Sequence, residues 1–132
     1  MLKKFEIKTA KREELLNISA FVEKAVKESG VKSGAAVIFC PHTTAAITIN
    51  ENADPDVCED IIKGLKKISP MDKNYAHIEG NSDAHIKSSL TGASQTIIIE
   101  NSKPLLGVWQ GVYFCEFDGP RTRTVFVKVM QL

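Results

Sequence analysis

The last third of the chain contains three apolar, strand-like segments in succession, and these constrain the fold more than any other feature. They are SQTIIIEN (94–101), LLGVWQGVYFCEF (105–117) and RTRTVFVKVM (121–130). No helical pattern separates them. Consecutive strands joined by short connections are typical of an antiparallel sheet, so the C-terminal third predicts one.

The first forty residues predict a strand, a helix and a second strand. Residues 2–9 alternate apolar and polar, which fits a half-buried strand. Apolar residues then recur, mostly three and four positions apart, from Leu15 to Val26, and Ser29 continues the spacing. This pattern predicts an amphipathic helix, and Gly30 is placed to end it in a left-handed cap. Residues 35–40 are predicted as a strand, with residues 41–52 as its antiparallel partner.

Two further helices are predicted in the middle of the chain. Asp54 is positioned to cap the first, and Pro55 occupies its first turn, where a missing N–H costs nothing. After a long polar loop, a second helix is expected from near Asn81 to Leu90, with Gly92 stopping it. The order β-α-β-β-α-α-β-β-β predicts one α+β domain over residues 1–132, a mostly antiparallel mixed β-sheet with helices packed on it.

Composition excludes several classes of partner. The formal net charge is +1 over 132 residues, so the chain lacks the basic excess that nucleic acids or anionic membranes attract. The three cysteines are odd in number and widely spaced, which argues against a disulfide framework and indicates a reducing compartment. No segment has membrane-spanning length. We therefore predict a cytoplasmic protein without a nucleic-acid or membrane partner.

The octapeptide EFDGPRTR (116–123) places four charges between two apolar strands. Glu116 and Asp118 precede a Gly-Pro turn, and Arg121 and Arg123 follow it. Arginine presents a planar fork that matches phosphate or carboxylate. The segment is therefore either a pair of structural salt bridges at a turn or one wall of an anion site. We predict that Arg121 or Arg123 lies beside a phosphate.

Polar side chains also interrupt residues 41–50, PHTTAAITIN. In an extended conformation one face is mostly polar and the other is apolar; the first comprises His42, Thr44, Ala46, Thr48 and Asn50. An ordinary solvent-facing strand and a functional ladder are equally compatible with this pattern. Asn50 is accordingly one candidate for binding a substrate.

The three histidines, His42, His77 and His85, all lie beside polar loops or strand ends. Three imidazoles suit zinc or a similar transition metal, although their spacing matches no ligand motif. Asn81 lies one helical turn before His85, so the two side chains are expected on one face. Asn81 is predicted as a helix cap or a substrate ligand, and Lys87 as a phosphate ligand.

Four segments together resemble one family. The segments HTTAAITINENADPDV, YAHIEGNSDAHIKSSLTGAS, LLGVWQG and EFDGPRTR are similar, in order, to the signatures of the YjbQ-like family, also called the secondary thiamine-phosphate synthase family. The resemblance extends from Pro41 to Val129. One departure is Val108, where the family usually has threonine before Trp-Gln.

The resemblance implies a compact α+β fold, a homotrimer, bound metal, and an activity that joins a pyrimidine diphosphate to a thiazole phosphate. It also implies a set of motif positions: His42, Asn50, Glu51, Asp54, His77, Asn81, His85, Asp118, Arg121 and Arg123. Among these, His42, His85, Asp118 and Arg121 are the expected catalytic residues. Zinc or a similar ion is expected on the histidines, and magnesium with a diphosphate substrate.

Three functions are consistent with these residues. The first is an enzyme acting on phosphorylated heterocycles, with synthase-type activity. The second is a metal-assisted hydrolase of a small phosphorylated substrate, because an imidazole-bound metal supplies a water nucleophile near neutral pH. The third is a non-catalytic module that binds a metal or an anion. All three share a small phosphorylated or anionic partner.

Overall fold

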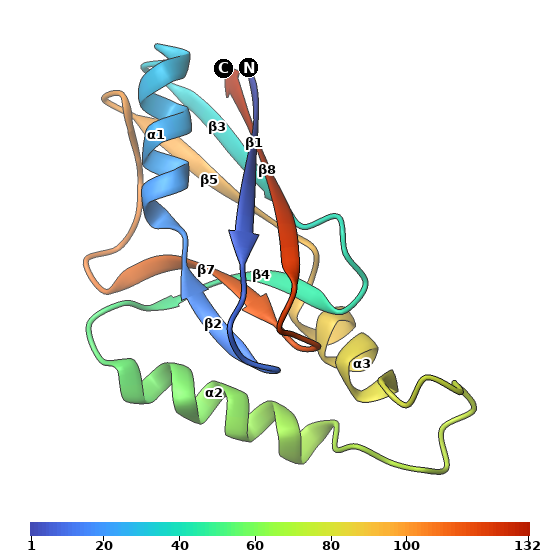
Figure 1. The fold of residues 1–132 in the computed structure, drawn as a ribbon. Coiled ribbons are helices and arrows are strands. Elements are labelled where there is room, and N and C mark those ends of the chain that lie inside the picture. Colours follow the sequence, from blue (N-terminus) through green and yellow to red (C-terminus); the bar gives the residue numbers. More distant parts are fainter.

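The computed structural model describes residues 1–132 and contains eleven elements of secondary structure (Figure 1). Three are helices and eight are strands. In chain order they are β1 (Leu2–Lys8), β2 (Glu14–Asn17), α1 (Ser19–Ser29), β3 (Gly34–Phe39), β4 (Ala45–Glu51), α2 (Pro55–Ile68), α3 (Ser82–Thr91), β5 (Ser94–Glu100), β6 (Lys103–Pro104), β7 (Gln110–Glu116) and β8 (Thr122–Gln131).

The strands form two antiparallel sheets that enclose the core. One has five strands in the order β1-β8-β3-β5-β6, and the other has three in the order β2-β7-β4. Val22, Ala25 and Val26 of α1 enter the same core as the inner faces of both sheets. The predicted α+β class with mostly antiparallel strands is confirmed, and every paired strand is antiparallel.

The predicted partner of residues 35–40 is wrong. β3 lies between β8 and β5, whereas β4 belongs to the other sheet and pairs with β7. The chain crosses between sheets at residues 40–44 instead of turning back. This placement covers β4 on both faces: Ile47 enters the main core, and Ala46 packs in a second cluster with Ala84 of α3.

The first predicted helix begins too early. Residues 14–17 form β2, which pairs with β7, and α1 starts only at Ser19. Leu16 packs against the main core while Leu15 packs against the second cluster, so the adjacent leucines serve opposite faces of the strand. Tertiary pairing therefore overrides the helical spacing. Gly30 ends α1 in the left-handed conformation, as predicted.

The predicted boundaries of α2 and α3 are confirmed. Asp54 caps α2 by accepting from the backbone N–H of Asp56 at 2.9 Å, and Pro55 opens the helix. α3 begins directly after Asn81 and is capped by Gly92. Both helices lie beside the three-stranded sheet, away from α1 (Figure 1). No helix is both long enough and apolar enough to cross a membrane.

Candidate functional site

A buried ion pair anchors the charged turn that follows β7. Arg123 donates from Nε to Glu116 Oε1 at 2.8 Å, and its Nη2 also bonds Glu116 and, at 2.8 Å, Thr44 Oγ1. Glu116 additionally accepts from Thr9 Oγ1 at 2.8 Å and from the N–H of Asp118 at 3.1 Å. Burial raises the pKa of Glu116, but Arg123 and these donors outweigh it and lower the pKa overall. The pair therefore joins the two sheets and fixes the turn.

Asp118 organises the side chains at the outer end of this turn. Its Oδ2 accepts from Asn81 Nδ2 at 2.8 Å and from Arg121 Nη2 at 2.9 Å. Arg121 also donates from Nε to the carbonyl oxygen of Asp118 at 3.0 Å. The Arg121 side chain remains 49% exposed, so its guanidinium is held in place yet open to solvent. Arg12 stands 3.9 Å from the other carboxylate oxygen.

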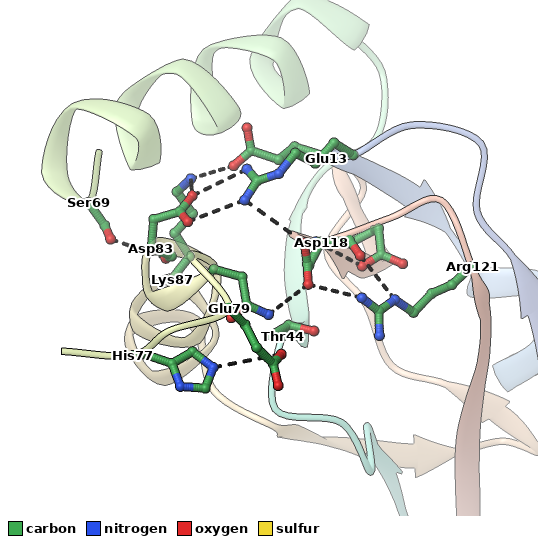
Figure 2. A network of polar contacts seen from close by, with 12 residues as sticks. Glu13, Thr44, Ser69, His77, Glu79, Asp83, Lys87, Asp118 and Arg121 are labelled. Carbon is green, nitrogen blue, oxygen red and sulfur yellow. Dashed lines mark hydrogen bonds and ion pairs between the residues drawn. The ribbon is translucent and has the colours of Figure 1, made fainter. Parts of the chain in front are cut away.

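Asn81 and Arg121 are among the residues that line an open cleft of about 280 Å³ without apolar walls. His77 and His85 lie edge to face with ring centroids 5.4 Å apart. His77 Nε2 is 3.7 Å from Glu79, and Figure 2 shows this pair below Asp118 and Arg121. The lining residues are Thr43, Thr44, His77, Glu79, Asn81, His85 and Arg121. We call this site the Arg121 cleft.

The Arg121 cleft is rich in hydrogen-bond donors. A fixed guanidinium, two hydroxyls and two imidazoles surround a space with one exposed carboxylate, Glu79. Arginine forks bind phosphate and carboxylate oxygens with charge-assisted hydrogen bonds. The arrangement therefore suits a small anion.

The amide of Asn81 has one buried atom without a partner. Its Nδ2 donates to Asp118, and a flipped amide would set two oxygens against each other, so the orientation is fixed by this bond. Oδ1 is then a buried acceptor that no donor of the chain satisfies. Unsatisfied buried polar atoms are rare in proteins and often mark sites with a further role.

Comparison with known proteins places the chain in one family. The model of the UPF0047 protein YjbQ-like family matches residues 3–132. The chain belongs to the YjbQ-like (UPF0047) family. It is 62% identical to a UPF0047 protein of Methanocaldococcus jannaschii, over 98% of this chain and 94% of that one. It is 56% identical to the UPF0047 protein YugU of Bacillus subtilis, over 98% and 99% of the two chains.

Solved structures of the family share the fold. An uncharacterised YjbQ/UPF0047 protein of Clostridium acetobutylicum is 59% identical with a TM-score of 0.95, over 97% of this chain and 99% of that one. A protein of unknown function from Sulfolobus solfataricus is 32% identical with a TM-score of 0.96, over 100% and 97%. The YjbQ-like fold expected from the four motifs is therefore confirmed.

In this YjbQ-like chain, the cleft brings together five of the residues singled out from sequence. Two stretches far apart in the sequence supply them: the loop and first turn of α3, and the turn between β7 and β8. They are His77, Asn81, His85, Asp118 and Arg121. Asn81 does not cap α3 through its side chain, because that side chain is engaged with Asp118.

Two predicted phosphate ligands lie in the interior instead. Arg123 is 2% exposed and bound to Glu116, so it cannot reach a ligand in the cleft. Lys87 is 1% exposed and bonds Glu13 and, at 3.1 Å, Asp83. Burying a cation is costly unless a carboxylate compensates, and these two are compensated within the chain. Neither side chain lines the Arg121 cleft, so a phosphate contact of Arg123 or Lys87 there stays a prediction.

His42 and Asn50 lie outside the Arg121 cleft. His42 Nε2 accepts from the N–H of Thr124 at 2.9 Å, and burial, reinforced by the charge of Arg123, lowers the pKa of its imidazole. Asn50 lies at the opposite end of β4, in a smaller hollow beside Trp109. His42 precedes β4 and Asn50 lies near its far end, so the two side chains are separated by the length of the strand and do not meet in one site.

The expected three-histidine metal site does not form within this chain. No group of three or more His, Cys, Asp or Glu side chains is arranged to hold a metal ion. His77 and His85 are neighbours, but one imidazole nitrogen of His42 is already occupied by a backbone N–H. Zinc sites require three or four protein ligands, so the histidines of a single chain do not complete one.

Sequence reasoning missed three residues of the site. Thr43 and Glu79 line the cleft, and Arg12 supports Asp118 from behind. Glu79 lies in the long polar loop, and Arg12 in the charged segment before β2. Both segments have an ordinary surface composition, so nothing in the sequence distinguishes these two charges from solvated ones.

Proposed function

We propose that this protein is an enzyme that acts on phosphorylated heterocyclic molecules and binds their phosphate in the Arg121 cleft. The specific reaction in the proposal is of the thiamine-phosphate synthase type, which the family resemblance implies. One observation carries the proposal: a half-exposed guanidinium, fixed twice by Asp118, faces two imidazoles across a cleft with no apolar lining. Such a site is built for an oxyanion.

The proposed reaction requires little covalent chemistry from the protein. The thiazole nitrogen attacks the pyrimidinylmethyl carbon, and the carbon–oxygen bond to diphosphate breaks, with its electron pair leaving on the diphosphate. Arg121 would stabilise the departing diphosphate, with the hydroxyls of Thr43 and Thr44 and the imidazoles of His77 and His85 as further donors. Donors fixed before the reaction act at full strength where charge develops.

A magnesium ion that arrives with a diphosphate remains part of the proposal. Magnesium is normally held by one or two carboxylates together with phosphate oxygens and water. Glu79 is the exposed carboxylate of the cleft, whereas Asp118 is engaged by Asn81 and Arg121. Glu79 would hold the ion, which would neutralise charge on the substrate. Zinc on the histidines would need ligands from more than one subunit, because one chain does not bring three of them together.

A homotrimer is also proposed. No helix covers the outer face of the five-stranded sheet, where Phe39 is 43% and Ile98 is 58% exposed. Val108 and Trp109 are 86% and 63% exposed in the loop before β7. Exposed apolar clusters usually mark interaction surfaces. Analytical ultracentrifugation should give three times the chain mass, and a monomeric mass would reject this part.

Turnover assays separate the three candidate functions. The purified protein is incubated with the pyrimidine diphosphate and the thiazole phosphate, and both thiamine phosphate and inorganic phosphate are measured. Thiamine phosphate supports the synthase, release of inorganic phosphate alone supports a hydrolase, and binding without turnover supports a non-catalytic module. Magnesium is varied in the same assay, and its chelation should abolish turnover if the ion is required.

Variants then test the cleft itself. Arg121→Met should lower the rate by roughly 10²–10³-fold, by analogy with the loss of one oxyanion donor. Lys63→Met, an exposed lysine of α2 outside every described hollow, is the matched control and should leave the rate unchanged. Equal rates for Arg121→Met and the parent protein would remove the Arg121 cleft from the reaction.

A further inference from the structure

A second, larger hollow lies next to the Arg121 cleft. Its volume is about 550 Å³, which falls within the range of small-molecule sites. Arg12 stands between the two: it donates to both oxygens of Asp83 at 3.2 Å and lies 3.9 Å from Asp118. The hollow is lined by Lys11, Arg12, Glu13, Lys66, Pro70, Met71, Asp83 and Lys87. We call it the Lys66 pocket.

The carboxylates of the Lys66 pocket are already shared between cations. Glu13 bonds Lys87 and lies 3.2 Å from Lys66. Asp83 accepts from Lys87 at 3.1 Å and from both Nη atoms of Arg12 (Figure 2). Burial raises the pKa of Asp83, but these cations outweigh it and lower the pKa, so the carboxylate is charged at neutral pH. Both carboxylates, Glu13 and Asp83, therefore already have cationic partners within the chain.

The pocket retains positive charge that the chain does not neutralise. Four cationic side chains face two carboxylates, which leaves an excess of two positive charges. Lys11 takes part in none of the ion pairs of the chain, and the Lys66 side chain is 58% exposed. A purely structural network needs only enough cations to match its buried acids. The most exposed cations of the pocket are Lys11 and Lys66.

The inner wall of the pocket consists of buried side chains that are held by hydrogen bonds. Lys87 and Asp83 are 2% and 0% exposed as side chains, and Ser69 donates to the carbonyl oxygen of Asp83 at 3.1 Å. At the mouth, Met71 is 66% exposed and Pro70 lies beside it. A buried charged wall, two exposed lysines and an apolar edge together match a small molecule with one anionic and one apolar end.

We propose that the Lys66 pocket binds a second phosphate-bearing small molecule, separate from the one in the Arg121 cleft. A phosphate monoester carries about −1.5 to −2 charge at neutral pH, which balances the excess of the pocket. Lys11 and Lys66 bind the phosphate oxygens, and the buried side of the pocket adds the positive charges of Arg12 and Lys87. Met71 contacts the organic part. This inference goes beyond the proposed function and does not depend on it.

Inorganic phosphate is the probe for the experiment. Backbone ¹H–¹⁵N spectra of the whole protein are followed as phosphate is added at low ionic strength. The parent protein should show two groups of shifted amides, one near Lys66 and Met71 and one near Thr43 and Arg121. Added sodium chloride should weaken both, because partly exposed charges are screened.

Paired lysine variants then test the pocket. Lys11→Met with Lys66→Met should raise the Kd reported by the pocket amides roughly tenfold, a change of about 1.4 kcal/mol. The cleft amides should keep their Kd. Lys63→Met with Lys67→Met removes two exposed lysines of α2 that do not line the pocket, and should change neither. The spectra themselves report whether each variant is folded.

Two results would overturn the proposal. One is a parent protein whose pocket amides do not move at millimolar phosphate. The other is an equal loss of binding in both double variants, which would indicate non-specific attraction to α2. Failure of the proposed function would give different results: the cleft amides would not shift when phosphate is added, or Arg121→Met would not change the rate of turnover.

Discussion

Replacing Arg123 with methionine leaves the carboxylate of Glu116 buried without its cation. Glu116 is 0% exposed, and Arg123 provides two of its hydrogen bonds and its only opposite charge. Removing one partner of a buried pair costs about 3–5 kcal/mol, because the remaining charge is both desolvated and unpaired. Since domains are typically stable by about 5–15 kcal/mol, the variant should lose a large part of its stability.

Urea unfolding followed by circular dichroism measures this loss. Arg121→Met is the matched control: it removes the same type of side chain two residues earlier, but that side chain is half exposed. Its free energy of unfolding should stay within about 0.5 kcal/mol of the parent value. The contrast separates the structural arginine from the one assigned to the cleft.

A double variant and a change of pH sharpen the test. Adding Glu116→Gln to Arg123→Met removes the orphan charge, so most of the lost stability should return. In the single variant, burial without a cation raises the pKa of Glu116, so the penalty should shrink near pH 4, about the unfolded pKa. An Arg123→Met protein within about 1 kcal/mol of the parent, or a double variant no better than the single one, would refute the reasoning.

Three further predictions concern stability and reactivity. Gly34→Ala places a methyl carbon 1.9 Å from a backbone carbonyl oxygen of β8 and should cost about 3 kcal/mol or more. Gly64→Ala meets open space on α2 and should instead stabilise by about 0.5–1 kcal/mol, and thermal unfolding measures both changes. Asp83 and Glu116 have lowered pKa values despite burial. Their stabilisation is therefore complete above the unfolded pKa of about 4 and is lost as the pH falls through the lower folded values, which acid unfolding should reveal. Burial raises the pKa of the Cys115 thiol, so a thiol reagent followed by mass spectrometry should modify it only after unfolding.

Local signals in the sequence were sufficient for several elements. Asp54 and Pro55 predict the start of α2, and Gly30 predicts the end of α1, because caps depend on a few neighbouring residues. The turn at Gly119 and Pro120 also follows from local chemistry. These features form in the same way wherever the segment is placed in the fold.

Pairing between distant segments could not be obtained in the same way. Residues 14–17 have helical spacing but become a strand because an edge of β7 is available to them. β3 and β4 are adjacent in sequence but join different sheets, because β4 needs cover from the core on one face and from α3 on the other. Neither partner is encoded near the segment that it pairs with.

The sequence by itself determined which side chains are available for chemistry: arginines after a turn, histidines beside loops, and carboxylates between strands. Only the tertiary structure decided how each is used. Arg121 and Arg123 are two residues apart with the same chemistry, but Arg123 lies within β8 and is buried, whereas Arg121 precedes the strand in a turn where Asp118 holds its half-exposed side chain at the cleft. Burial makes the first a structural ion pair, because a desolvated charge must be compensated where it lies. Exposure leaves the second free to hold a ligand.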